Sequence, residues 1–173
     1  MKHILRTVLL ISMLLFSIQS VWAESIDDRI RAAGLPSTNA VDLLKYAKDS
    51  DWQVREVVAK RQTTPSDILI SLAKDPSWQV RAAVSHNLKA PKAAIIPLVN
   101  DESVDVRFSV AHCGYTPSDL IVKLLNDPVF KVRKQAVVNL NVPLSVLKEI
   151  AAGNSDIADT AKKALEKRLI DGE

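Results

Sequence analysis

The chain of 173 residues is poor in the residues on which many catalytic and extracellular folds depend: it has four glycines, one cysteine and 5% aromatic residues. With Cys113 alone, no internal disulfide can form, so stability has to come from packing. The sequence contains no glycine-rich phosphate loop, no HExxH and no convincing catalytic triad or carboxylate pair. A thiol nucleophile at Cys113 would need a base, and the adjacent His112 points about 100° away on a helix. We therefore expect no enzymatic activity.

Long hydrophobic runs are also scarce. The longest begins the chain, from Thr7 to Ile18 after a positively charged start, and is too short for the ~20 residues that span a bilayer. Small and β-branched residues follow, up to Ala23, so residues 1–23 are predicted to be a signal peptide cleaved after Ala23. An uncleaved anchor is the alternative. We expect a periplasmic or secreted protein, with no stable membrane insertion after cleavage.

The chain has no large excess of charge of one sign. The chain has 23 Lys and Arg and 20 Asp and Glu, and residues 1–23 contain two of the basic residues and none of the acidic ones. The rest of the chain therefore carries 21 basic and 20 acidic residues, a net charge of +1. Such a chain has no long-range field to attract phosphate backbones, so nucleic acid is not expected as a partner. Its length suits one domain.

What the sequence does contain is a repeat of 26 residues, which has an Asp, a Val-Arg pair and a Pro in a fixed frame. A short fixed period indicates a stacked repeat architecture. The four units are 49–74, 75–100, 101–126 and 127–152. The repeated prolines are Pro65, Pro91, Pro117 and Pro143.

Each unit predicts two helices. In the first half, Val80 and Val84 fall on one face at about 100° per residue, after capping oxygens at Asp75. In the second half, Thr64 and Pro65 read as a cap and a first helical residue, followed by apolar residues at helical spacing. No segment alternates apolar and polar residues as a half-buried strand would. The fold class is therefore all-α, a solenoid of helix–helix repeats.

The two ends are degenerate, as solenoid ends must be to meet water. Residues 24–48 are predicted to form an N-terminal cap with a half repeat, since 39–48 matches the second half of a unit with Asn39 in place of Pro. Residues 153–173 are predicted to form a C-terminal capping helix, in which Gly153 and Asp159 replace the Asp and the Arg.

The unit DPSWQVRAAVSHNLKAPKAAIIPLVN resembles the leucine-rich repeat variant family, whose unit is an Asp-Pro-x-x-x-Val-Arg helix followed by a Pro-led leucine segment. The resemblance is good over 39–152 and weak over 153–170, and HEAT repeats share the Asp and Val-Arg feature. It implies a right-handed superhelix of alternating α- and 3₁₀-helices. The family's best-known member has a cysteine-rich iron–sulfur segment; this chain has no cysteine cluster, so no cofactor is expected.

The repeated arginines are predicted to be structural. A cation in the first turn of a helix opposes the macrodipole unless it is paired, and the repeated aspartates are the natural partners, within a unit or across the stack. The predicted ladder consists of Asp49, Arg55, Asp75, Arg81, Asp101, Arg107, Asp127 and Arg133. A second repeated position, occupied by Trp52, Trp78, Val104 and Phe130, is interpreted as packing between units; an exposed binding stripe is the alternative.

Function is expected on the outward positions where the units differ. Phe108 is the outward residue that packing explains least, and an apolar patch on a repeat surface indicates a partner. We predict a monomeric exported scaffold that binds an unidentified protein through Glu56, Lys60, Ala82, His86, Phe108, His112, Lys134 and Val138.

Two alternatives stay open. His86 and His112 share one position in consecutive units, and Cys113 follows, which is a plausible ligand set for zinc or copper. The chain would then be a metal- or redox-linked periplasmic factor, although the spacing of stacked helices argues against such a site. The other alternative is a secreted effector or inhibitor module.

Overall fold

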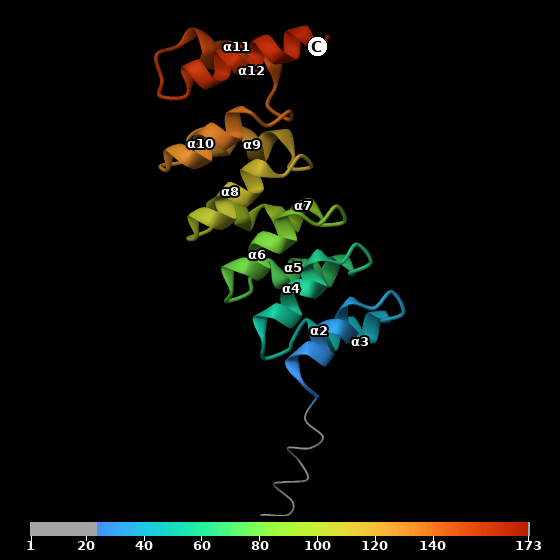
Figure 1. Ribbon diagram of the computed structural model, residues 1–173. Coiled ribbons are helices and arrows are strands. Elements are labelled where there is room, and N and C mark those ends of the chain that lie inside the picture. Colours follow the sequence, from blue (N-terminus) through green and yellow to red (C-terminus); the bar gives the residue numbers. More distant parts are fainter. Residues whose placement is uncertain (1–23, 173) are drawn as a thin grey trace, which may run out of the picture.

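The computed structural model describes residues 24–172, which form a stack of short helices (Figure 1). Within this part of the chain there are eleven α-helices, one 3₁₀-helix and no strand. The predicted all-α solenoid is therefore confirmed. The predicted signal peptide, residues 1–23, lies outside the described residues. No helix within 24–172 is both long enough and apolar enough to cross a bilayer.

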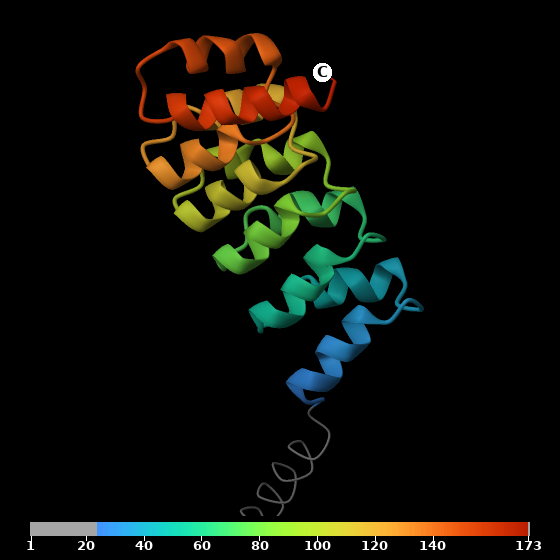
Figure 2. The same cartoon turned by 45° about the horizontal axis from the view of Figure 1, so that its top comes forward.

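The helices form two layers that alternate along the chain (Figure 2). The first layer holds the first helix of each unit: α2 (Ile26–Gly34), α4 (Trp52–Lys60), α6 (Trp78–Ser85), α8 (Val104–His112), α10 (Phe130–Val137) and α12 (Ala158–Ile170). The second layer holds α3 (Ala40–Tyr46), α5 (Ser66–Leu72), α7 (Lys92–Ile95) with the 3₁₀-helix η1 (Pro97–Asn100), α9 (Ser118–Leu124) and α11 (Leu144–Ala152).

The second layer differs from the alternation of α- and 3₁₀-helices that the resemblance implied. α3, α5, α9 and α11 are α-helical, and only the unit 75–100 contains a 3₁₀-helix among the described residues. The cause is Pro97, which has no backbone N–H to continue the bonding of α7. The chain therefore tightens into η1 at this proline.

The prolines before the second-layer helices occupy the N-cap position, and not the first helical position that was predicted for them. Pro65 and Pro117 are the N-cap residues of α5 and α9, in extended backbone, not the first helical residues. The preceding threonines do not cap these helices either. Thr64 and Thr116 are buried, and their hydroxyls donate over 2.6 and 2.8 Å to the carbonyls of Val58 and Val110 in the preceding first-layer helix.

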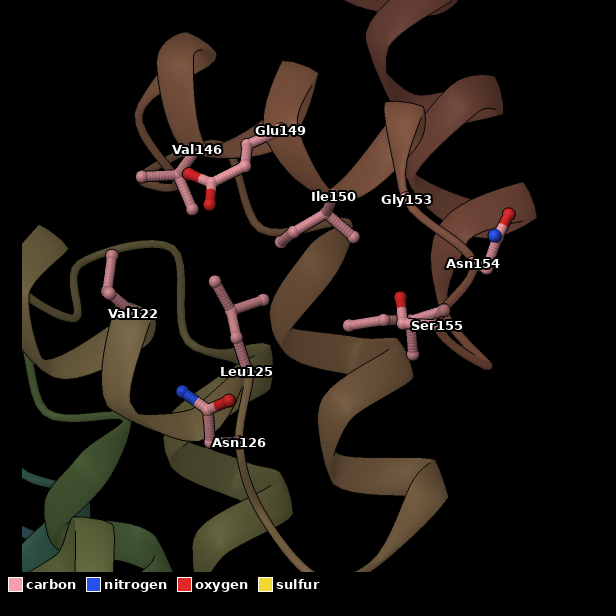
Figure 3. A pocket seen from close by; sticks show the side chains of 10 residues that line it. Val122, Leu125, Asn126, Val146, Glu149, Ile150, Gly153, Asn154 and Ser155 are labelled. Carbon is pink, nitrogen blue, oxygen red and sulfur yellow. The ribbon is translucent and has the colours of Figure 1, made fainter.

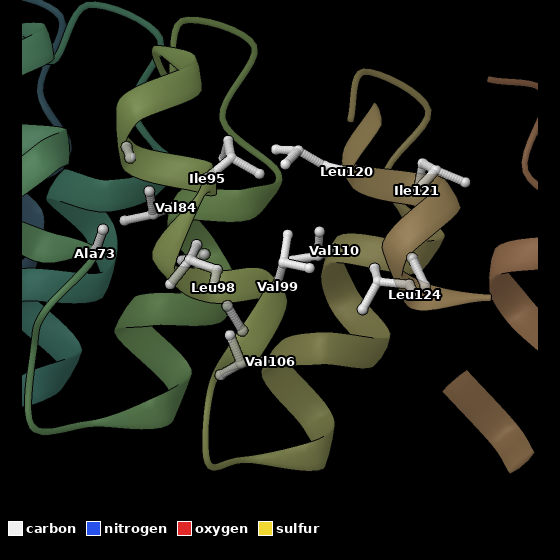
Figure 4. Close-up of a cluster of buried hydrophobic side chains, with 14 of the residues drawn as sticks. Ala73, Val84, Ile95, Leu98, Val99, Val106, Val110, Leu120, Ile121 and Leu124 are labelled. Carbon is white, nitrogen blue, oxygen red and sulfur yellow. The ribbon is translucent and has the colours of Figure 1, made fainter. Parts of the chain in front are cut away.

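The core is one continuous strip between the two layers (Figure 4). Val80, Val106 and their equivalents in the repeat are fully buried, as are Leu98 and Leu120 of the second layer. Each such side chain contributes about 1.5–3 kcal/mol by leaving water. Since the first-layer helices carry small residues, such as Ala83 beside Val84 and Ala111 beside Val110, consecutive helices can approach closely.

Both ends complete the two layers. α2 is a first-layer helix that the sequence analysis did not assign to a repeat, and its Arg29 lies 26 residues before Arg55. At the other end α11 and α12 pack side by side, and α12 also contacts α10 (Figure 2). At 13 residues, α12 is the longest of the described helices and buries Ala158 and Ala161.

Candidate interaction surfaces

The Arg and Asp side chains of the repeat join each unit to the next. Arg55 donates from Nε to Asp75 Oδ2 over 2.6 Å and from Nη2 to Asp75 Oδ1 over 2.8 Å. Its Nη1 donates over 2.8 Å to the backbone carbonyl of Asp49, in its own unit. The same pattern links Arg81 to Asp101 and Asp75, Arg107 to Asp127 and Asp101, and Arg133 to the carbonyl of Asp127.

The interior ion pairs of this ladder are largely buried, and each arginine donates two hydrogen bonds to its aspartate. The side chains of Arg107 and Asp127 are 11% and 3% exposed, and the pair is bidentate. The hydrogen bond to Asp127 raises the pKa of Arg107 above its ordinary value, although burial acts in the opposite direction. Each interior aspartate also accepts from a backbone N–H two residues on, as Asp127 does from Val129 over 2.8 Å. Because these donors and acceptors are already paired with one another, few of them remain for binding a ligand.

The ladder extends beyond the residues predicted for it. Arg29 pairs with Asp49 at 2.9 Å and so adds an N-terminal rung. At the C-terminal end, Gly153 has no carboxylate, and Arg133 pairs instead with Asp156. The Arg29 rung could have been found from its spacing, but Asp156 is out of register and could not.

A second link runs along the opposite ends of the first-layer helices. Asn87 Nδ2 donates over 2.7 and 2.8 Å to the carbonyls of Ala59 and Arg61 of the preceding unit. Asn139 donates in the same way to Ala111 and Cys113, over 2.9 and 3.0 Å. Cys113 occupies this position in its own unit and has no amide to donate. A polar pocket of about 70 Å³ lies between the units 75–100 and 101–126, lined by Ser85, Asn87, Tyr115 and their neighbours.

The residues predicted to face outward belong to the first layer, and all of them except Ala82 are exposed or half-buried. Ala82 is buried, not exposed, because α6 packs between α4 and α8, which cover its methyl group. Lys60 and Glu56 form an ion pair at 2.8 Å. Lys134 and Val138 are exposed on α10 and at its end.

Phe108, His112 and His86 gather into one cluster on this layer. Phe108 is half-buried and lies nearly parallel to the His112 ring, with an interplanar angle of 6° and centroids 6.2 Å apart. His86 comes from the preceding unit, and its ring centroid is 6.1 Å from that of His112. The Lys131 ammonium lies 5.7 Å from the Phe108 centroid. Phe108 is therefore largely accounted for by contacts within the chain.

Cys113 does not join the two histidines as a metal ligand. Its side chain is buried, whereas both histidines are exposed. Among residues 24–172, no group of three or more His, Cys, Asp and Glu side chains is placed to hold a metal ion. The three-residue set His86, His112 and Cys113 is therefore not assembled, because the thiol turns into the packing between units.

The aromatic side chains that begin the first-layer helices are more exposed than their interpretation as packing implies. Trp52, Trp78 and Phe130 are 36%, 43% and 46% exposed. As the first residues of α4, α6 and α10, they stand at the edge of the stack, beside the Arg–Asp ladder. The guanidinium of Arg133 lies 5.9 Å from the Phe130 centroid.

The surface of the second layer carries an apolar stripe that the sequence analysis did not single out. It has one exposed or half-buried aliphatic side chain per unit: Leu44, Ile70, Ile96 and Val122. The signal was present in the sequence, since Ile68, Leu69 and Leu72 already complete the buried face of α5, and Ile70 is one apolar residue more than that face needs. At the corresponding position of α11 stands Lys148, which ends the stripe.

The stripe leads into a pocket between α9 and α11 with a volume of about 360 Å³. Figure 3 shows Val122 and Leu125 of α9 and its end facing Val146 and Ile150 of α11. Asn126 and Glu149 supply polar groups at the same pocket. It is an apolar hollow with a few polar groups, which is the usual make-up of a binding site.

The layers and the two lines of inter-unit hydrogen bonds define the chain as an α-solenoid built from helical repeats. No protein-family model and no curated protein matches the sequence. In structure, the chain is similar to a solved protein described as a leucine-rich repeat variant with a novel repetitive structural motif. The TM-score is 0.65 and the sequence identity 26%, over 83% of this chain and 57% of that one. The predicted resemblance to a leucine-rich repeat variant is thus confirmed, and the chain spans little more than half the length of that protein.

Proposed function

We propose that this solenoid is an exported, non-catalytic scaffold that binds an amphipathic helix of another protein along its second layer. The observation that carries the proposal is the apolar stripe Leu44, Ile70, Ile96 and Val122. Repeat arrays provide extended surfaces of this kind, and contiguous exposed apolar groups mark interaction sites. The second layer therefore replaces the Phe108 region as the favoured surface, since Phe108 packs on its own neighbours.

The spacing of the stripe favours a helix as the bound segment. Neighbouring helices pack about 8–10 Å apart, so the stripe offers one apolar contact at each such interval. On a partner helix, residues seven positions apart lie on one side and about 10.5 Å apart. A helix with a leucine or similar residue in each heptad would thus meet consecutive units, as in helix-in-groove recognition.

The pocket between α9 and α11 supplies an anchor at one end of the stripe. Its aliphatic walls, from Val122, Leu125, Val146 and Ile150, suit one large apolar side chain of the partner. The Glu149 carboxylate at the pocket suits a lysine or arginine next to that side chain. The helix would therefore carry a bulky apolar residue and a basic residue near one end.

Photo-crosslinking tests this surface in cells that make the chain. A crosslinking amino acid at exposed Ala93, beside Ile96, should capture a defined partner protein, and the same group at Lys134 on the first layer should not. Adding Ile70→Ser and Ile96→Ser should abolish capture without changing the melting temperature, because both side chains are at least one-third exposed. Equal capture from both layers, or capture that survives the double substitution, would overturn the proposal.

Export has its own test, because it depends on residues 1–23 alone. Fractionation of the same cells should place the chain outside the cytoplasm, and its N-terminal residue should be Glu24. A chain that begins at Met1 and stays in the cytoplasm would refute export and leave the binding surface unaffected.

A further inference from the structure

The two histidines after residue 23 lie next to each other on the first layer, away from the stripe. His86 is the C-cap of α6 and His112 is the last residue of α8, so they are 26 residues apart in the sequence. Their ring centroids are only 6.1 Å apart, and both side chains are exposed. The rings thus lean towards each other across the space between two stacked helices.

The hydrogen bonding of His86 determines which nitrogen is available. Nδ1 lies 3.2 Å from the backbone carbonyl of Ala82 and 3.2 Å from the Ser85 hydroxyl. A carbonyl oxygen can only accept, so in the neutral ring this contact places the proton on Nδ1 and leaves the lone pair on Nε2. Donation from the far nitrogen to a backbone carbonyl is one of the arrangements that orient metal-binding histidines.

His112 is held by its own neighbours. The Phe108 ring lies nearly parallel to it, and Phe108 is itself packed against the core. Lys131, which lies near the Phe108 ring, is paired with Asp105 at 2.9 Å, and Lys60, at the repeat position of His86 in the preceding unit, is paired with Glu56 at 2.8 Å. These pairs reduce the repulsion that a bound cation would meet here.

The ring separation fits two imidazoles sharing one ion. With metal–nitrogen bonds of about 2.0–2.1 Å, the two ring centroids stand roughly 5.2 Å apart at a tetrahedral angle and roughly 6.4 Å apart in trans positions of the square-planar geometry that Cu²⁺ favours. The observed 6.1 Å lies between these values. A small rotation of the two exposed side chains can bring the ring centroids to either separation.

We infer that His86 and His112 together bind a divalent first-row transition-metal ion, with Cu²⁺ bound most tightly. Imidazole suits copper, nickel and zinc, and Cu²⁺ has the highest affinity in the Irving–Williams order. No third His, Cys, Asp or Glu of residues 24–172 joins them, so water occupies the other coordination positions. The buried thiol of Cys113 takes no part.

Copper titration tests the site directly. The full chain is expressed and purified with or without residues 1–23, whichever form the cell produces. It carries the substitution His3→Ala, so that His86 and His112 are its only histidines in either form. Titration with Cu²⁺, followed by calorimetry and electron paramagnetic resonance, should show one tight equivalent with two nitrogen ligands from imidazole. His86→Ala and His112→Ala should each weaken binding at least tenfold, and Zn²⁺ and Ni²⁺ should bind more weakly than Cu²⁺.

Two controls keep the result interpretable. Circular dichroism melts in EDTA should be the same for all the variants, because both histidines are exposed. Lys134→Ala, which lies on the same layer outside the cluster, should bind Cu²⁺ like the parent. If either single histidine variant retains parental affinity, or the spectrum shows one imidazole nitrogen, the two-histidine site is refuted.

Discussion

At the scale of single residues, the repeated arginine is the side chain that joins one unit to the next. Arg107 uses Nε and Nη2 on the Asp127 carboxylate of the next unit, and Nη1 on the carbonyl of Asp101 in its own. The planar fork of a guanidinium allows three such contacts at once, which a lysine ammonium cannot reproduce. One side chain therefore fixes the position of one unit relative to the next.

Replacing Arg107 by alanine should lower the free energy of unfolding by about 3 kcal/mol, because Asp127 would be left buried without its partner. Arg107→Lys should recover only part of this loss. Thermal melts measure both. Since its hydrogen bond to Asp127 raises the pKa of Arg107, the guanidinium stays charged across the neutral range, and its contribution to stability should be lost on the alkaline side only in strong alkali.

The matched control is Lys131→Ala, which removes an ion pair whose two side chains are 52% and 55% exposed. Such surface pairs contribute about 0–1 kcal/mol. If the two variants melt alike, or if Arg107→Ala melts like the parent, the ladder is not a structural device.

At the scale of helices, the ends of the first layer differ from unit to unit. Asn87 and Asn139 donate to carbonyls at the ends of the preceding helices, whereas Cys113, at the same position of its own unit, has no amide to donate. The junction between α6 and α8 therefore has one inter-unit link fewer than its neighbours. Packing of α6 on α8 is otherwise like that of α8 on α10.

Cys113→Asn should restore this link, by donating to the carbonyls of Ser85 and Asn87 as Asn139 does one unit later. We expect a gain of about 1 kcal/mol per added hydrogen bond, reduced by the constraint on one more side chain. A rise in melting temperature of a few degrees would show it.

Cys113→Ser serves as the comparison, since a hydroxyl is too short to reach both carbonyls. A Cys113→Asn protein that melts no higher than the serine variant would show that the position tolerates the amide without using it.

At the scale of the whole molecule, stability depends on closing the stack. Each unit buries its apolar faces on its neighbours, so an end without a cap would expose one. α12 performs this function at the C-terminus, where it covers α11 and the end of α10.

Removal of residues 154–173 should therefore expose apolar surface on α10 and α11 and cause the chain to aggregate or to melt at lower temperature. Light scattering and circular dichroism measure the two effects. The substitution Leu169→Ser, on the half-exposed side of α12, should leave both nearly unchanged. A truncated chain that stays monodisperse with the parental melt would show that α12 is not a cap.

Much of this architecture could be predicted from the sequence. The 26-residue period identifies the stacked units, and the cost of a cation at a helix N-terminus indicates that Arg55 and its equivalents need acids. Arg29 belongs to the same series but was not recognised, because its unit lacks the proline that marks the others. Asp156 is out of register and could be found only from the fold.

The candidate surfaces were less predictable. Ala82 occupies an outward position by helical periodicity, yet neighbouring helices cover it. Periodicity describes one helix at a time, and the exposure of a side chain depends also on the helices beside it. For the same reason, the separation of His86 and His112 could not be derived from their spacing in the sequence.

The sequence by itself determined the all-helical repeat, its length and the residues that hold it together, because these follow from local periodicity and charge. Tertiary structure decided which aspartate each arginine meets, that Cys113 faces inward, and that Leu44, Ile70, Ile96 and Val122 form one stripe. These features arise between units, where the distance and rotation from one helix to the next determine which side chains come together.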